Sequence, residues 1–217
     1  MLTFFSSNLL WSEGLYIFFG IVVIGLLGFI FFRPLLYITL IFFAFSLYFF
    51  RNPERVCVQA LNDTATLICP ADGTVVDIQY NRENGLEGYA QKISIYLSPI
   101  DVHVNWTPMA GVIEDVIYKP GTFAMAFLPK SSELNERNDI IIRNAQGDSI
   151  LVRQIAGTIA RRICCWVNKN EQVNAGFKYG MIRFGSRVDI LMPHNVMLAV
   201  GVGQKVLGGQ TVLGRWQ

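Results

Sequence analysis

The sequence predicts an all-β domain, a barrel or a sandwich, preceded by an N-terminal membrane-inserting hairpin of two helices. The first observation is a change in composition, because Glu13 and Arg33 are the only charged side chains before Arg51. The second is a series of short β-branched runs after Arg51, separated by turn-forming residues. We therefore divide the chain into a hairpin, residues 1–50, and a single domain, residues 51–217.

The hairpin prediction depends on two apolar runs, residues 15–32 and 35–50, which are separated by Arg33-Pro34. As helices they would reach ~27 Å and ~24 Å, against a hydrocarbon core of ~30 Å. Neither run has a polar face, which argues against helices lying flat on the surface. These lengths are compatible both with helices that cross the whole membrane and with helices that insert from one side without crossing. Arg51 and Arg55 follow the second run, which places the domain on the cytoplasmic side of the cell membrane.

The domain shows strand patterns with no convincing helical period. Strands are predicted at residues 74–78, 92–97, 111–118, 139–143, 149–156, 158–163, 181–193 and 196–202. Strands at this spacing indicate a sandwich or a barrel. Residues 111–121 and 201–209 resemble the hairpins of biotinyl and lipoyl carrier domains, which implies a hybrid barrel of that kind. The short motif that carries the modified lysine of such carriers is absent, so this resemblance implies no function.

Composition argues against several classes of function. The net charge is only +2, and no basic stripe is interleaved with aromatic residues, so no nucleic-acid partner is expected. The four cysteines form no C-x-x-C pair and the two histidines show no ligand spacing, so no metal site is predicted. Reduced structural thiols are expected instead. The phosphate-binding motif G-x-x-x-x-G-K-[ST] is also absent.

Nucleophilic chemistry has three candidate residues. Gly185-Ser186 interrupts the strand pattern of residues 181–193, which indicates either a bulge or a reactive peptide bond. His103 lies in a proline-bounded segment after a strand and is a candidate base, or a histidine satisfied by nearby backbone groups. Asp72 precedes a glycine and is either a turn former or the carboxylate that orients the base.

Four segments carry a resemblance to a known family. They are Arg51-Asn-Pro-Glu-Arg55, Pro70-Ala-Asp-Gly73, Leu97-Ser-Pro-x-Asp-Val-His-Val-Asn105 and Arg183-Phe-Gly-Ser-Arg-Val-Asp189. In this order they resemble the short form of phosphatidylserine decarboxylase, a pyruvoyl-dependent family. The resemblance covers residues 49–217, and a membrane-inserting N-terminus fits the same family.

The resemblance implies a proenzyme that cleaves itself between Gly185 and Ser186. The products would be a β chain, residues 1–185, and an α chain, residues 186–217, which form a heterodimer; a higher oligomer is left open. Ser186 would become a pyruvoyl group, which forms a Schiff base with membrane phosphatidylserine and accepts electrons as carbon dioxide leaves. The product would be phosphatidylethanolamine. Asp72 and His103 would orient Ser186 and move protons.

A phospholipid substrate requires hydrogen-bond donors for its phosphate. Arg187 and Lys119 are candidates, although each is also typical of a solvated surface charge. Trp106 stands where long-form members carry a second histidine. His103 would therefore serve both cleavage and protonation, or Asp72 would act more directly. Other lipid carriers of the headgroup, such as archaeal ether lipids, stay open.

Two other classes of function compete with this interpretation. One is a membrane-tethered serine protease with a Ser–Lys or Ser–His pair, although no Ser-x-x-Lys occurs in the sequence. The other is a non-catalytic carrier or adaptor barrel, in which Ser186 would be only a turn residue. Only the decarboxylase interpretation requires two chains with a modified residue 186.

Overall fold

The structure is a computed structural model, and it describes residues 11–80, 87–121, 135–157, 162–183 and 186–217. The chain divides into two compact units, Met1–Glu54 and Arg55–Gln217. Each unit is described by itself.

The first unit contains helices α2 (Trp11–Phe31) and α3 (Arg33–Phe49), which pack against each other. The ring of Phe18 lies 6.0 Å from that of Phe43 and 5.8 Å from that of Phe50, centroid to centroid. The predicted break at Arg33-Pro34 is wrong by one or two residues, because only Phe32 is non-helical. Proline is tolerated in the first turn of a helix, where its missing N–H would have no helical partner.

Helix α2 is long and apolar enough to cross a membrane. Within the described residues it is the one helix that meets both criteria, over Gly14–Phe31, while the apolar helix α3 is shorter, with 17 residues. The α2 side chains Phe19, Phe29 and Phe31 are each more than 60% exposed. Large apolar side chains exposed along a helix support membrane association.

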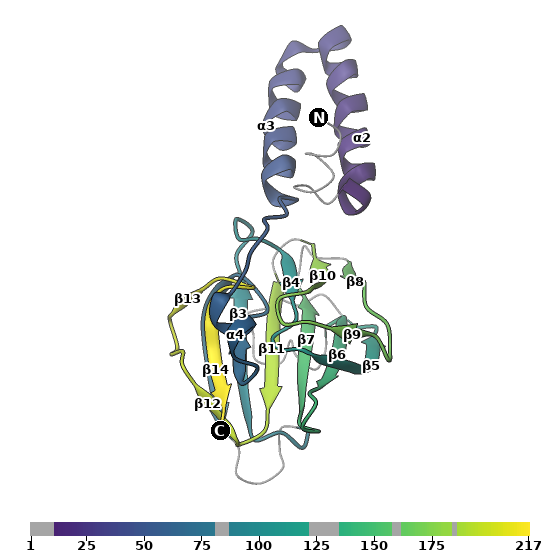
Figure 1. The fold of residues 1–217 in the computed structure, drawn as a ribbon. Coiled ribbons are helices and arrows are strands. Elements are labelled where there is room, and N and C mark those ends of the chain that lie inside the picture. Colours follow the sequence, from purple (N-terminus) through teal and green to yellow (C-terminus); the bar gives the residue numbers. More distant parts are fainter. Residues whose placement is uncertain (1–10, 81–86, 122–134, 158–161, 184–185) are drawn as a thin grey trace. The chain divides into compact units, whose positions relative to one another are not determined.

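The described residues of the second unit form three antiparallel sheets and one short helix, α4 (Val58–Asn62) (Figure 1). Two of the sheets have three strands each: β1 (Thr66–Ile68), β14 (Val212–Trp216) and β12 (Val196–Leu198); β4 (Val104–Trp106), β10 (Lys178–Ile182) and β8 (Ile163–Cys165). The third runs in the order β13 (Lys205–Val206), β2 (Gly73–Tyr80), β3 (Gln91–Leu97), β11 (Ser186–Met192), β7 (Ser149–Ala156), β6 (Arg137–Arg143), β5 (Gly111–Lys119) and β9 (Gln172–Val173). The prediction of an all-β domain is confirmed in its coarser form: the unit is mostly β-sheet, but it also contains the short helix α4, which was not predicted. These sheets are open in the described residues.

Strand β11 lies in the middle of the large sheet and pairs with β3 on one edge and β7 on the other. Its side chains alternate between two faces, as expected for a strand. Val188, Ile190 and Met192 join the hydrophobic core, and all three are fully buried. Arg187 and Asp189 belong to the opposite face.

The prediction of one bulged strand over residues 181–193 is wrong. The segment contains the end of β10 and the whole of β11, and these strands belong to different sheets. The chain therefore changes sheets between Ile182 and Ser186. Because the two strands follow each other closely in sequence, their apolar alternation looks continuous.

We predict that Ile190→Ala destabilises the protein strongly. The side chain is fully buried in the central strand, so its truncation should cost about 3 kcal/mol. For a chain of this size that corresponds to a fall of about 6–12 °C in melting temperature. Thermal unfolding of the full chain in detergent micelles measures this.

Val202→Ala is the matched control, because Val202 is 64% exposed in a turn. Its effect should stay within about 0.5 kcal/mol. Equal melting temperatures for the two variants would contradict the central position of β11 in the core.

Candidate active site

Ser186 is the first residue of β11, opposite Leu97 of β3 and Ala156 of β7. It is fully buried and shares its face of the strand with Val188. Its hydroxyl has no hydrogen-bond partner among the described residues. An unpaired buried hydroxyl costs about 1–3 kcal/mol, so its presence calls for an explanation, and a catalytic role is one. Gly185 lies outside the described residues.

His103 lies in the loop between β3 and β4, as predicted, and is fully buried. Its Nδ1 is 3.0 Å from the main-chain oxygen of Asp101, so local backbone accounts for one ring nitrogen. The main-chain oxygen of His103 accepts a hydrogen bond of 3.2 Å from the N–H of Ile182. This bond holds the histidine loop against the last residue of β10, four positions before Ser186.

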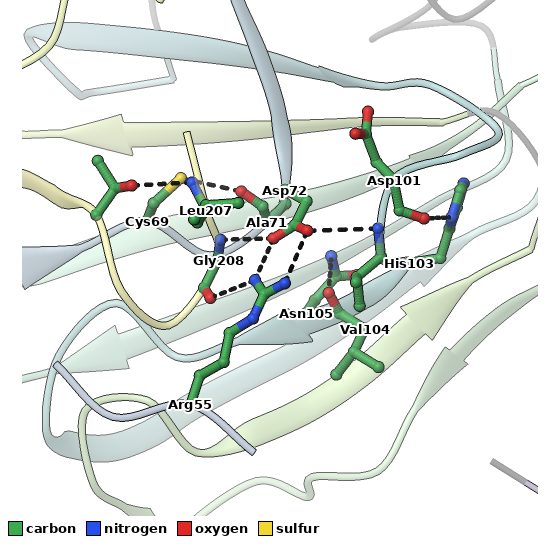
Figure 2. A network of polar contacts seen from close by, with 12 residues as sticks. Arg55, Cys69, Ala71, Asp72, Asp101, His103, Val104, Asn105, Leu207 and Gly208 are labelled. Carbon is green, nitrogen blue, oxygen red and sulfur yellow. Dashed lines mark hydrogen bonds and ion pairs between the residues drawn. The ribbon is translucent and has the colours of Figure 1, made fainter. Parts of the chain in front are cut away.

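Asp72 is buried in the turn before β2, and it does more than form that turn. Its carboxylate is paired with the guanidinium of Arg55, with one bond of 2.9 Å between Nη2 and Oδ2 (Figure 2). It also accepts hydrogen bonds from the N–H of Gly208 at 2.8 Å and that of Val102 at 3.4 Å. The side chain of Asp72 therefore contacts the main chain of the histidine loop, at Val102. The Ser186 hydroxyl is bonded to neither Asp72 nor His103 in this structure.

The two candidate phosphate donors lie in different surroundings. Arg187 is 4% exposed, and its Nε lies 2.8 Å from Oδ1 of Asp189. Interpretation of Arg187 as a solvated surface charge is therefore wrong, and a phosphate there would compete with Asp189. Strand alternation also puts Arg187 on the face opposite Ser186. Lys119 is exposed at the end of β5.

A chain of buried amides lies on the same face of the large sheet as Ser186, and the sequence reasoning missed it. Nε2 of Gln154 donates to Oδ1 of Asn105 at 2.8 Å, and Nδ2 of Asn138 donates to Oε1 of Gln154 at 3.2 Å. Gln154 is opposite Val188, two register positions along from the Ser186–Ala156 pair and therefore on the same face. The available signal was a polar residue at a core-facing position of a β-branched strand. The hydrogen-bonded amides therefore place polar groups in the otherwise apolar core on the face that contains Ser186.

Burial makes two of the four thiols, Cys69 and Cys165, poor nucleophiles. Burial is the main cause that raises the pKa of the Cys69 thiol to about 12, so it is protonated at neutral pH. The pKa of Cys165 is raised as well, again mainly by burial. Across the described ranges, histidine, cysteine and carboxylate side chains form no cluster suited to a metal ion. The buried serine and the buried histidine loop held beside β10 are therefore the candidates for nucleophilic chemistry.

Comparison with known proteins identifies the class. The family model described as phosphatidylserine decarboxylase matches residues 42–214. A phosphatidylserine decarboxylase proenzyme of Salinibacter ruber is 46% identical over 84% of this chain and 80% of its own length. Proteins with the same name from Pelagibacter ubique and Desulfotalea psychrophila are 47% and 43% identical, covering 77% and 83% of this chain and 78% and 84% of their own lengths. The chain belongs to the phosphatidylserine decarboxylase family.

We predict that Gly208→Ala disturbs the packing around Asp72. An added Cβ would lie 2.5 Å from the ring of Trp106 and 3.0 Å from the backbone of Ala71. Both residues are fully buried, so relieving the overlap requires the packing to shift, at a cost of about 1–3 kcal/mol. The melting temperature of the full chain should fall by about 2–4 °C per kcal/mol.

Gly201→Ala is the matched control, because a Cβ at Gly201 meets no atom within 4 Å. It should unfold at the wild-type temperature. If Gly208→Ala also did so, the tight packing between Gly208 and Trp106 would be disproved.

Proposed function

We propose that this protein is a self-processing decarboxylase that converts phosphatidylserine to phosphatidylethanolamine. The observation that carries the proposal is the buried, unpaired hydroxyl of Ser186 at the start of the central strand, in a chain of this family. The relatives are named proenzymes, which implies processing of a precursor in those proteins.

Processing would begin with attack of the Ser186 oxygen on the carbonyl carbon of Gly185. The C–N bond breaks, an ester forms, and the amide nitrogen of Ser186 becomes a free amine. Loss of the α-proton of Ser186 expels the carboxylate of Gly185 and leaves dehydroalanine. Addition of water and loss of ammonia then give a pyruvoyl group at position 186. A buried hydroxyl fits this role, because burial excludes the bulk water that would hydrolyse the ester; the last step then needs a single water molecule to reach position 186.

His103 and Asp72 are proposed to support this chemistry from two sides. His103 would take the proton of the Ser186 hydroxyl as general base, a role suited to imidazole near neutral pH. Asp72 would act more indirectly, because its carboxylate holds the main chain at Val102 next to His103. Trp106 packs beside the Arg55 guanidinium and next to Gly208, so the second histidine of long-form members has no counterpart there.

The pyruvoyl group, once formed, would supply a carbonyl that condenses with the substrate amine and accepts the electron pair released with carbon dioxide. The chain's own residues would position the reacting atoms. Leu97 and Ala156 flank position 186 and keep it dry. His103 would return a proton to the carbon that lost carbon dioxide.

The two proposed chains, 1–185 and 186–217, would stay together as a heterodimer. The smaller chain supplies β11, which is hydrogen-bonded to β3 and β7 of the larger chain along both edges. It also supplies β14, which pairs with β1. Separation would break the main sheet in its middle, so cleavage need not release either product.

The substrate is proposed to be reached at a membrane surface. The apolar helices of residues 1–50 would insert as a hairpin, with the domain on the cytoplasmic side as the arginines after α3 suggest. An apolar pocket of about 280 Å³ in the second unit supports a lipid ligand, because its lining includes Val56, Leu61 and Phe177.

Lys119 remains a proposed phosphate donor, and Arg187 would serve only if it left Asp189. The biotinyl-like barrel remains a proposal about architecture alone.

The first test of this function is intact mass and activity. Wild-type protein should consist of two chains, the second starting with a pyruvoyl-modified residue 186, and should release carbon dioxide from phosphatidylserine vesicles. Ser186→Ala should remain one full-length chain without activity, because it lacks the attacking oxygen. Ser94→Ala is the control, since Ser94 is also buried but lies on the neighbouring strand β3.

An active wild-type preparation that consists of one uncut chain would contradict the proposal. So would normal processing of Ser186→Ala. A membrane-tethered protease would instead cleave other proteins, and a carrier barrel would show neither cleavage nor carbon dioxide release.

The second test compares the two histidines. His103→Ala should slow self-cleavage by about 10²–10⁴-fold, the contribution typical of a positioned general base. His194→Ala is the matched control, because His194 is exposed in the turn after β11. A time course of cell-free synthesis with phospholipid vesicles, read as the half-time of conversion to two chains, measures both. Equal half-times for the two variants would remove His103 from the mechanism.

A further inference from the structure

The carboxylate of Asp72 is bonded to one guanidinium and to two backbone N–H groups. Its two oxygens are occupied by the Arg55 guanidinium and by the N–H groups of Gly208 and Val102. Asp72 is 4% exposed, so these partners, rather than water, decide its position. A buried carboxylate with a paired guanidinium and backbone donors is held in one orientation.

Arg55 is the residue that connects these groups. Besides both carboxylate oxygens of Asp72, its Nη1 donates to the main-chain oxygen of Gly208 at 2.9 Å (Figure 2). Its Cζ lies 5.0 Å from the centre of the Trp106 ring, within range of a cation–π contact. The guanidinium side chain is only 11% exposed. Lysine has one charged nitrogen and could not make this planar set of contacts.

The contacts of Arg55 join three segments: the turn of Asp72, the turn of Gly208, and strand β4 with the histidine loop before it. Asp72 leads to Val102, whose neighbour is His103, and Gly208 lies in the segment that follows Ser186. Trp106 follows the histidine loop in β4. Displacement of the guanidinium would therefore release the histidine loop and the 208 turn at the same time.

We propose that Arg55 is a positioning residue for self-cleavage: it fixes Asp72, and through Asp72 it sets the histidine loop relative to the strand that begins at Ser186. This inference rests on the proposed function. The contacts of Arg55 are with Asp72, Gly208 and Trp106 and not with the Ser186 hydroxyl, so we expect it to act on the reaction through geometry. A misplacement of about 1 Å in such a site can cost about 10²-fold in rate.

A second buried arginine provides a stringent control. Arg153 is 4% exposed and is paired with Asp139 through bonds of 2.7 Å and with Glu87 through bonds of 2.8 and 3.0 Å. It is opposite Asp189 in the register of β11 and β7, so it lies on the face of the sheet away from Ser186. Loss of Arg153 also breaks a buried ion pair, but at a place where the proposal expects no effect on cleavage.

The experiment compares Arg55→Gln, Arg55→Lys and Arg153→Gln as full chains with phospholipid vesicles. We expect Arg55→Gln to slow the conversion to two chains by about 10²-fold, and Arg55→Lys to recover part of that loss because it retains the charge. Arg153→Gln should lower the melting temperature at least as much, yet change the half-time less than about twofold. The assay temperature is kept below the onset of unfolding of every variant.

The route through Asp72 is tested by combining Arg55→Gln with Asp72→Asn. If Arg55 acts through Asp72, the double variant should cleave about as slowly as the slower single variant, since the two changes disable one unit. Multiplied losses, or wild-type cleavage by Arg55→Gln, would overturn the proposal. The proposal would also be overturned if Arg153→Gln slowed self-cleavage as much, for each degree lost in melting temperature, as Arg55→Gln does. If the wild type itself stayed uncut, the proposed function would fail, and that outcome is separate from these.

Discussion

Pairing of β11 along both of its edges is the constraint on which the rest of the second unit depends. Every residue of this strand is opposite β3, and all but the last are also opposite β7. This register decides which side chains enter the core. A slip of one residue would move the Ser186 hydroxyl to the other face and bury Arg187 among aliphatic side chains. The position of the nucleophile is therefore a property of the sheet.

The two faces of the large sheet bury polar groups in different ways. The face with Ser186 satisfies its amides by hydrogen bonds between Asn105, Gln154 and Asn138. The opposite face pairs its charges, as Arg153 does with Asp139. Hydrogen bonds from Arg153 are the main cause that lowers the pKa of Glu87. Buried charges are tolerated only when paired, so this face stabilises one register over its alternatives.

The sequence was sufficient for the long strands, because β-branched runs such as β3 and β7 carry a period that spans most of their length. Strands β9 and β13 have two residues each and carry no period, and they were missed; the five-residue strand β14 was missed as well, whereas β12 lies within the predicted strand at residues 196–202. The boundary between β10 and β11 was also missed, since a change of sheet leaves no local pattern when two strands follow closely.

The candidate site also has a part that local sequence predicts and a part that it does not. Ser186, His103 and Asp72 each lie in a short motif, so a linear reading can find them. The hydrogen bond from Arg55 to Gly208 joins positions 153 residues apart, and no local pattern predicts it. Burial of Arg187 likewise depends on its partner Asp189 and on the strands that cover both. What local sequence leaves open is the set of contacts that fixes the site residues in space.

The position of the proposed scissile bond follows from this architecture. A cut inside a strand would leave unpaired backbone groups in a sheet, at a cost for each buried group. Here the cut would fall where the chain passes from one sheet to another. Ile182 is already fixed by β8 and by the main chain of His103, while Ser186 is fixed by β3 and β7. Each new end would therefore keep its own partners, and the new terminus at position 186 would remain in the dry surroundings in which the serine was held.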